Sequence, residues 1–272
     1  MTKINASIVI YKNTKTQLQS VIDSVMKIND LGKLYIIDNS PEHGDRVKRI
    51  ISSKDKSKIE YIHSSVNLGY GAAHNIAIRK SLDNNTDYHI VLNPDVSFDS
   101  QIIDELVCYS VDNNDVGLMM PQVLHKGGKV QYLAKLLPTP LDLFVRRFIP
   151  IKKIRDKFNY KYTLRHMGYN KIMDVPSLSG CFMFLRVNAL RRVGLFDENI
   201  FLYMEDIDIS RRIHSKYRTV YYPNVSIYHD YNKGSYKTLK LLICHIKSAI
   251  YYFNKWGWFF DKDRSNINKR YV

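Results

Sequence analysis

Apolar positions in the first 120 residues alternate between the period of a strand and the period of a helix. Short apolar runs rich in β-branched residues predict buried strands at 7–11, 33–38, 59–63, 88–92 and 116–120. Between these runs, as at 18–26 and 71–81, apolar residues recur three and four positions apart, which predicts helices. This repetition predicts an α/β fold with a mostly parallel sheet flanked by helices on both faces.

The pattern changes after residue 120. Pro138, Pro140 and Pro150 predict a loop-rich insertion over 135–175 that contains one helix. Further on, the spacing predicts a strand at 181–187, a helix at 205–214 and one or two strands over 219–228. From residue 239 onward, apolar residues form a helical stripe that Trp256 and Trp258 follow.

These changes suggest a division of the chain. We expect one domain over 1–235, with a first half of about 1–120 and a second half of about 121–235. A C-terminal amphipathic helical segment over 236–272 would follow, as a membrane or dimer contact or as a helix packed on the core. The sequence leaves the oligomeric state open.

The chain carries a large excess of positive charge. Its 41 Lys and Arg residues against 26 Asp and Glu give a net charge of +15, and nine of the basic residues fall within 141–171. Nucleic acid, an anionic membrane surface and phosphorylated substrates are candidate partners, and plain solubilisation is the alternative. Nucleic acid is disfavoured because the basic residues gather in the insertion, whereas the predicted strand ends carry acids.

The cysteines and the termini indicate a compartment. Cys108, Cys181 and Cys244 are odd in number and far apart, so they predict neither a disulfide framework nor a metal cluster. The first ten residues lack a signal-peptide pattern, and no apolar run reaches the roughly 18 residues of a membrane span. We expect a cytoplasmic protein.

Acidic and glycine-rich motifs stand where the predicted strands end. Asp38 and Asp95 each follow an apolar strand, and ligands of parallel sheets bind beyond the carboxyl ends of the strands. Asp95 could hold Mg²⁺ or Mn²⁺ against a diphosphate. After Asn67, the glycines Gly69 and Gly71 open an Ala-rich helix, where backbone amides favour phosphate. Each motif also suits a plain turn, and both readings stay open.

Two more motifs lie in the second half. Glu205 and Asp206 follow apolar residues, and a carboxylate beside apolar walls gains a raised pKa that suits a general base. Helix capping and an ion pair between Asp208 and Arg212 would explain the same acids. His229 is either structural or a ligand.

The order and spacing of these motifs resemble the large family-2 inverting glycosyltransferases, and among them the rhamnosyltransferase-type enzymes of bacterial cell-surface polysaccharides. The resemblance covers about residues 4–235. It is carried by Ser7-Ile8-Val9-Ile10-Tyr11, Ile37-Asp38-Asn39-Ser40, Asn67-x-Gly69-x-Gly71-x-x-x-Asn75, Asn93-Pro94-Asp95, Ser179-Gly180, Phe196-Asp197-Glu198, Phe201-x-x-x-Glu205-Asp206-x-Asp208 and His229.

The resemblance implies a GT-A fold, in which a nucleotide-binding half merges with an acceptor-binding half. It implies that Asp206 is the catalytic base, that Glu205 lies beside it at the acceptor, and that Asp95 and His229 contact a Mg²⁺ or Mn²⁺ ion. The donor site would be formed by Tyr11, Asp38, Asn67, Gly69, Asn93 and Asp95. Asn93 departs from the Asp-x-Asp form of the family, which removes one carboxylate from the expected metal site.

The resemblance also implies partners. The donor would be a dTDP- or UDP-sugar, with rhamnose or another hexose, and the acceptor a glycan or a polyprenyl-diphosphate-linked glycan. Arg146, Arg147, Lys152, Lys153 and the segment 239–260 would then bind the anionic inner face of the membrane. A nucleotidyltransferase is the enzymatic alternative, but residues 11–14 lack the Gly-rich loop that such an enzyme places after its first strand. A basic non-enzymatic nucleic-acid-binding protein is the other.

Overall fold

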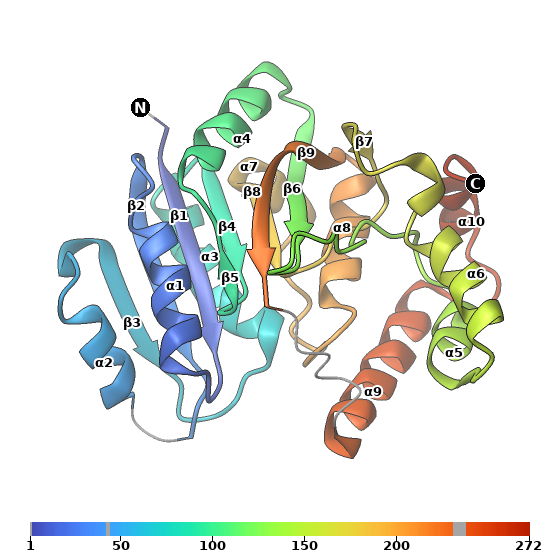
Figure 1. Cartoon of the computed structure of the whole chain (residues 1–272), viewed down its shortest axis with the longest axis horizontal. Helices are drawn as coiled ribbons and strands as arrows, with labels where there is room; N and C mark the ends of the chain where they lie inside the picture. Colours follow the sequence, from blue (N-terminus) through green and yellow to red (C-terminus); the bar gives the residue numbers. More distant parts are fainter. Residues whose placement is uncertain (1, 42–43, 231–237) are drawn as a thin grey trace.

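The protein is described here by a computed structural model that covers residues 2–41, 44–230 and 238–272, without the side chains of 45–46, 144 and 146–148. Its centre is one sheet of nine strands in the described part, in the order β3-β2-β1-β4-β8-β6-β9-β5, with β7 paired to β9 (Figure 1). The strands are β1 (Ile4–Ile10), β2 (Leu31–Asp38), β3 (Ile59–His63), β4 (Tyr88–Leu92), β5 (Val96–Ser97), β6 (Val116–Leu124), β7 (Met173–Asp174), β8 (Phe182–Arg186) and β9 (Arg218–His229).

Helices and two short 3₁₀ segments connect these strands. They are α1 (Lys15–Val25), α2 (Asp45–Ile51), η1 (Lys56–Lys58), α3 (Tyr70–Asp83), α4 (Gln101–Asp112), α5 (Pro140–Phe148), α6 (Lys152–Tyr162), η2 (Arg165–Met167), α7 (Val187–Val193), α8 (Glu205–His214), α9 (Leu239–Trp256) and α10 (Lys262–Lys269). The predicted α/β architecture with a mostly parallel sheet is therefore confirmed.

The direction of the strands decides where a site can form. β3, β2, β1 and β4 run parallel, and all seven residues of β1 are buried, as expected for a central strand covered on both faces. β8 is antiparallel to both β4 and β6, whereas β9 is parallel to β6. The ends of β2, β4 and β9 and the start of β8 consequently meet at one edge of the sheet (Figure 1).

The insertion differs from its prediction, because it holds two helices, α5 and α6, instead of one. Thr139 and Asp142 form a capping box, and Pro140 occupies the first turn of α5. A proline is well tolerated there, since the first amides of a helix have no intrahelical acceptor. Pro140 therefore begins a helix, and Pro150 lies between α5 and α6.

The segment around Pro223 forms one long strand. The pairing of β6 with β9 passes from Tyr222 directly to Ser226, so the intervening residues 223–225 have no partner in β6. Proline cannot donate to a ladder, and a bulge is where a strand tolerates it.

The C-terminal helices are tied to α8 by buried polar contacts. Arg211 donates two hydrogen bonds to Asp261, at 2.6 and 2.7 Å, and both side chains are at most 4% exposed. The indole of Trp256 donates to Asp208 at 2.8 Å, and Lys255 pairs with the same carboxylate at 2.8 Å. Helices α9 and α10 therefore support the helix that begins at Glu205.

Candidate active site

Asp95 and His229 meet at the edge of the sheet formed by the ends of β4 and β9. Asp95 follows β4 and is held by its own carbonyl, which accepts the amide hydrogen of Asp230 at 3.0 Å. Its Oδ1 lies 3.3 Å from Nε2 of His229, the last residue of β9, and both side chains are largely buried. The amide nitrogen of Asn93 lies 3.4 Å from the same imidazole nitrogen. Three of the predicted donor-site and metal-site residues are thus neighbours.

Asp206 lies in the first turn of α8, directly after a strained turn. Tyr203 and Met204 both adopt left-handed backbone angles, with φ of 68° and 72°, which costs non-glycine residues about 1–3 kcal/mol each. Oδ2 of Asp206 accepts a hydrogen bond from the Gly180 amide at 3.1 Å, and Oδ1 accepts one from the Ile207 amide at 2.9 Å. The carboxylate is partly exposed and is held by backbone amides.

Glu205 is in a different environment from its neighbour. Its side chain is buried, and its Oε2 has no hydrogen-bond partner. Burial, together with the nearby charge of Asp206, raises the pKa of Glu205 well above its ordinary value, although a backbone hydrogen bond and the charge of Lys135 act in the opposite direction. Glu205 therefore favours its neutral form.

The backbone at the start of β8 connects Asn93, which lies beside Asp95 and His229, with Asp206. The carbonyl of Cys181 accepts the amide hydrogen of Asn93 at 2.9 Å, while the adjacent amide of Gly180 holds Asp206. The hydroxyl of Tyr70 donates to the Gly180 carbonyl at 2.5 Å. Burial raises the pKa of Tyr70 well above its usual range, and the charges of Glu205, Asp206 and Asp95 add to that rise. These acids therefore all lie near one tyrosine hydroxyl.

Asp38 and Tyr11 lie further along the same edge, where Ile10 pairs in register with Asp38. Asp38 is only 2% exposed, and its two oxygens accept hydrogen bonds from the Ser40 amide at 2.9 Å and the Tyr61 hydroxyl at 2.8 Å. Tyr11 is 46% exposed. Asp38 shapes the end of β2, and its contact with a nucleobase stays a prediction.

Gly69 joins the start of α3 to the turn before α8. Its φ is +86°, its amide donates to Oδ1 of Asn67 at 3.0 Å, and its carbonyl accepts from Asn39 at 2.9 Å. A Cβ atom at this position would lie 2.2 Å from the carbonyl oxygen of Phe201. Only glycine permits this approach. The backbone therefore requires glycine at position 69, whether or not Gly69 also contacts the donor as predicted.

Four residues of this region were not singled out from the sequence: Tyr70, Gln131, Lys135 and Gly180. The predicted motifs hold no signal for Gln131 and Lys135, which lie in an extended segment between β6 and α5. Tyr70 and Gly180 stood inside quoted motifs, but their roles depend on a contact between remote parts of the chain.

The donor set fits a divalent cation that shares its coordination with a phosphate ligand. Across the residues that the structure describes, no group of three or more His, Cys, Asp or Glu side chains could hold a metal ion. Asp95 and His229 offer two ligand atoms, with the amide of Asn93 beside them. Mg²⁺ sites commonly use one or two protein carboxylates and complete their shell with water and substrate phosphates.

Sequence comparison identifies the family. The family model described as glycosyl transferase family 2 matches residues 7–198. A hexosyltransferase of low-salt glycan biosynthesis, Agl10 of Haloferax volcanii, is 24% identical over 205 residues, which are 75% of this chain and 60% of that protein. The N-acetylglucosaminyl-diphospho-decaprenol L-rhamnosyltransferase of Mycobacterium tuberculosis is 27% identical over 180 residues, 63% of this chain and 58% of that protein. The chain thus covers less than two thirds of either relative.

Solved structures share the fold. GalNAc-T7 with UDP, GalNAc and Mn²⁺ superposes with a TM-score of 0.68 at 14% identity, over 96% of this chain and 49% of that one. The mannosyltransferase PcManGT of Pyrobaculum calidifontis, in complex with GDP-Man and Mn²⁺, gives a TM-score of 0.61 at 15% identity, over 92% and 64%. The expected GT-A fold is confirmed. Because the family model spans most of its length, this chain belongs to glycosyl transferase family 2.

Proposed function

We propose that this protein is an inverting glycosyltransferase of bacterial surface polysaccharide synthesis. It moves rhamnose or another hexose from a dTDP- or UDP-linked donor to a hydroxyl of a glycan or lipid-linked glycan. The observation that carries the proposal is the hydrogen bonding of Asn93 and Asp206 to the adjacent residues Cys181 and Gly180, which supports a metal site at Asp95 and His229 near the carboxylate of Asp206. Family membership and the named relatives favour this reading over the nucleotidyltransferase and nucleic-acid alternatives.

The residues divide the reaction between two sides of the sugar. Asp206 takes the proton of the acceptor hydroxyl as that oxygen bonds to the anomeric carbon, and the bond from that carbon to the donor phosphate breaks. Asp95 and His229 face the leaving diphosphate, where a bound divalent cation would neutralise developing charge. The site offers Asp206 as a partly exposed carboxylate, while Glu205 beside it is buried and favours its neutral form. A single displacement with inversion follows.

A screen of donors tests this proposal. The full chain is heated with dTDP-rhamnose, UDP-glucose, UDP-N-acetylglucosamine and GDP-mannose, each with Mn²⁺, with Mg²⁺ or with EDTA. A donor that binds the folded state raises the melting temperature according to its concentration and affinity. We expect one dTDP- or UDP-sugar to do so only with a cation, and Asp95→Asn to reduce the shift. Absence of any shift, with no transfer in product analysis, would contradict the proposal.

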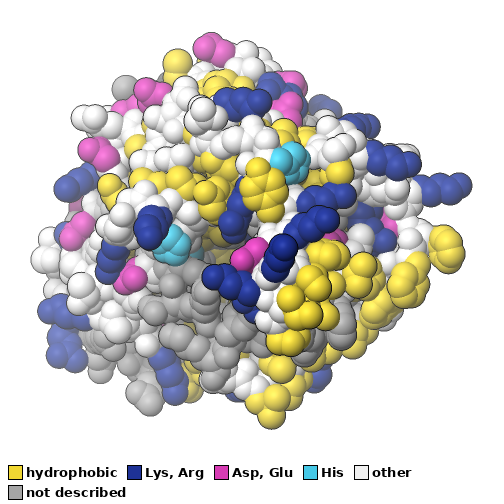
Figure 2. Space-filling view, turned by 45° about the vertical axis from the view of Figure 1, so that its right-hand side comes forward, with side chains coloured by type: hydrophobic (Ala, Val, Ile, Leu, Met, Phe, Trp, Pro, Cys, Tyr) yellow, Lys and Arg dark blue, Asp and Glu magenta, His cyan; other side chains and the backbone are white. Residues whose placement is uncertain are grey.

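The lipid-linked acceptor and the membrane face are supported by exposed apolar side chains. Leu239, at 71% exposed, Ile243, Ile246 and Ile250 follow one another along α9 at helical spacing, and Phe260 is 98% exposed. Figure 2 shows hydrophobic side chains gathered beside Lys and Arg on this side of the molecule. An interface of lipid headgroups accommodates both kinds of side chain. No helix among the described residues is long and apolar enough to cross a bilayer.

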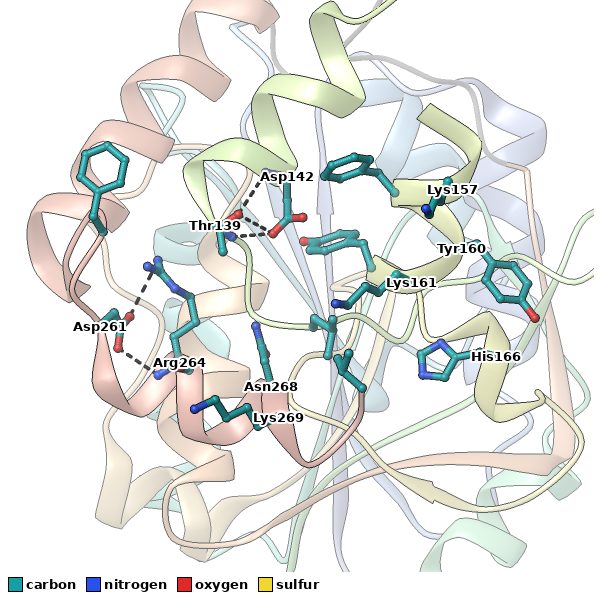
Figure 3. A pocket seen from close by; sticks show the side chains of 16 residues that line it. Thr139, Asp142, Lys157, Tyr160, Lys161, His166, Asp261, Arg264, Asn268 and Lys269 are labelled. Atoms are coloured by element: carbon teal, nitrogen blue, oxygen red, sulfur yellow. Dashed lines mark hydrogen bonds and ion pairs between the residues drawn. The ribbon is translucent and has the colours of Figure 1, made fainter. Parts of the chain in front are cut away.

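A cavity of about 890 Å³ adds a site for an anionic amphiphile on the same part of the molecule. Apolar side chains, among them Leu136, Phe158 and Phe259, line it together with lysines of α6 and α10, which outnumber the carboxylates of Asp142 and Asp261 (Figure 3). Its lining excludes Asp95, Asp206 and His229, so the cavity is separate from the candidate active site. The Mycobacterium tuberculosis relative is named for a diphospho-decaprenol substrate, and such a lipid has this chemistry.

Vesicle binding tests the membrane part of the proposal. Lys152 and Lys153 are exposed, whereas the side chains of Arg146 and Arg147 lie outside the described residues. We expect co-sedimentation with vesicles that contain phosphatidylglycerol, and a loss of at least tenfold in the double variant Ile243→Glu/Ile246→Glu. Val111→Glu, at an exposed apolar position of α4, is the matched control. The proposal is that the protein is cytoplasmic and held at the inner membrane face. It would be contradicted if the protein bound neutral and anionic vesicles equally and if the double variant bound as well as Val111→Glu.

A further inference from the structure

We propose that Gln131 is a positioning residue that fixes the ring tautomer of His229, so that the Nε2 atom of His229 presents a lone pair toward Asp95 for a divalent cation. The inference rests on the metal role proposed for His229. Gln131 is 5% exposed and contacts the Nδ1 atom of His229. Asp95 lies by the other ring nitrogen, Nε2.

The hydrogen bonds of Gln131 determine the orientation of its amide. Its Nε2 donates to the backbone carbonyl of His229 at 2.8 Å and lies 3.3 Å from the carbonyl of Leu124. A flipped amide would place its oxygen against these two carbonyls, and acceptors repel one another. Oε1 of Gln131 therefore faces Nδ1 of His229, at 3.1 Å.

This orientation determines the imidazole. An amide oxygen only accepts hydrogen bonds, so Nδ1 of His229 must carry a hydrogen. In a neutral imidazole the other nitrogen, Nε2, is then unprotonated and available as a ligand. Metal-bound histidines commonly gain their orientation from such a hydrogen bond on the second nitrogen.

The contact on the other side of the ring agrees with this. Nε2 of His229 lies 3.3 Å from Oδ1 of Asp95. With the hydrogen on Nδ1, two acceptor atoms face each other across this distance, an arrangement that a bound divalent cation would stabilise. A carboxylate oxygen and an imidazole nitrogen this close together would both hold one divalent cation.

The fold explains why this residue stands here. The chain turns back after β6, and the Gln131 amide donates to the Val123 carbonyl at 2.8 Å. Leu124 of β6 pairs with Tyr228 of β9, so the returning segment passes beside the end of β9, where His229 lies. Gln131 thus reaches His229 from an element that contributes no predicted ligand.

The test uses the full chain and the variant Gln131→Met, which keeps the length of the side chain and removes its polar group. Gln122→Met is the matched control, because Gln122 lies in β6 and donates to the Tyr169 carbonyl at 3.2 Å, outside the site. Nitrogen-15 NMR of the metal-free protein reports the tautomer of His229, assigned with His229→Gln. Electron paramagnetic resonance reports the affinity for Mn²⁺ in the presence of UDP.

We expect the Nδ1–H tautomer in the wild type and its loss in Gln131→Met, together with a 10- to 100-fold weaker affinity for Mn²⁺. Gln122→Met should keep both properties. An Nε2–H tautomer or a doubly protonated ring in the wild type at pH 8, or equal Mn²⁺ affinities in the two variants, would overturn the inference. A protein that keeps the tautomer and binds Mn²⁺, yet consumes no nucleotide-sugar, would refute the proposed function and leave the role of Gln131 standing.

Discussion

Asn93 and His229 lie at the ends of β4 and β9, with the amide nitrogen of Asn93 3.4 Å from the imidazole Nε2. A carboxylate at position 93 would face the same space as Asp95 Oδ1, which is 3.3 Å from that nitrogen. The strand ends therefore hold one carboxylate and one amide where two carboxylates would give a stronger metal site.

Asn93→Asp should tighten the binding of Mn²⁺. The added negative charge attracts the cation, and we expect the dissociation constant to fall about tenfold, or about 1.4 kcal/mol. Asp95→Asn should weaken binding by at least as much. Titration of Mn²⁺ by electron paramagnetic resonance measures both. If neither substitution changes the affinity, the cation binds elsewhere.

The pKa of Glu205 predicts a dependence of stability on pH. Because that pKa is raised, the folded protein holds a proton that the unfolded chain releases near pH 4.5, and this residue lowers stability as pH rises above that value. Glu205→Gln removes the effect. We expect its stability relative to wild type to rise by at least about 1.4 kcal/mol between pH 5 and pH 8, measured by urea unfolding.

Glu198→Gln is the control of opposite sign. A hydrogen bond from Asn75, and then the contact with Arg79, lowers the pKa of Glu198, so its charged form contributes stability at neutral pH that is lost as pH falls. If the free energy of unfolding depended on pH in the same way for Glu205→Gln, Glu198→Gln and the wild type, Glu205 would have an ordinary pKa and the prediction would fail.

The buried ion pair between Arg211 and Asp261 should stabilise the packing of α10 against α8. Asp261→Asn leaves a buried guanidinium without its countercharge, and breaking such a pair costs about 3–5 kcal/mol. Asp263→Asn, at an exposed position of α10, should change stability by less than about 0.5 kcal/mol. Equal melting temperatures for the two variants would contradict this role.

Gly69→Ala should destabilise the contact between the start of α3 and the turn before α8. The new Cβ atom would meet the Phe201 carbonyl at 2.2 Å in a backbone of positive φ, and we expect a loss of at least about 2 kcal/mol in denaturant unfolding. Gly127→Ala is the matched control, because no atom lies within 4 Å of its added Cβ. A Gly69→Ala protein as stable as the control would show that the approach to Phe201 is easily relaxed.

The strands and their carboxyl ends could be predicted because buried parallel strands are continuous apolar runs. The acids at 38, 95 and 206 were found by their place after such runs or beside apolar residues. The buried state of Asp38 could not be predicted, because it depends on Tyr61 in the neighbouring strand and on the close approach of Gly44, whose Cβ would lie 2.9 Å from Asp38 Oδ2.

Other features depend on long-range contacts. Gln131 reaches His229 only through the register of β6 with β9, and hydrophobic periodicity carries no information about register between remote strands. The insertion was predicted with one helix and holds two, for a local reason: Pro140 begins α5 although proline usually interrupts a helix.

The central claim is that Asp206 takes the proton of the acceptor while the donor binds at Asp95 and His229. The most direct measurement compares donor binding and product formation, under saturating nucleotide-sugar, for wild type, Asp206→Asn and the control Asp112→Asn, at an exposed position of α4. We predict that Asp206→Asn lowers transfer about 10²- to 10⁴-fold while its donor affinity stays within about twofold of the control, and that the wild-type product has inverted anomeric configuration. Transfer by Asp206→Asn at the rate of the control, or a retained configuration, would contradict the claim.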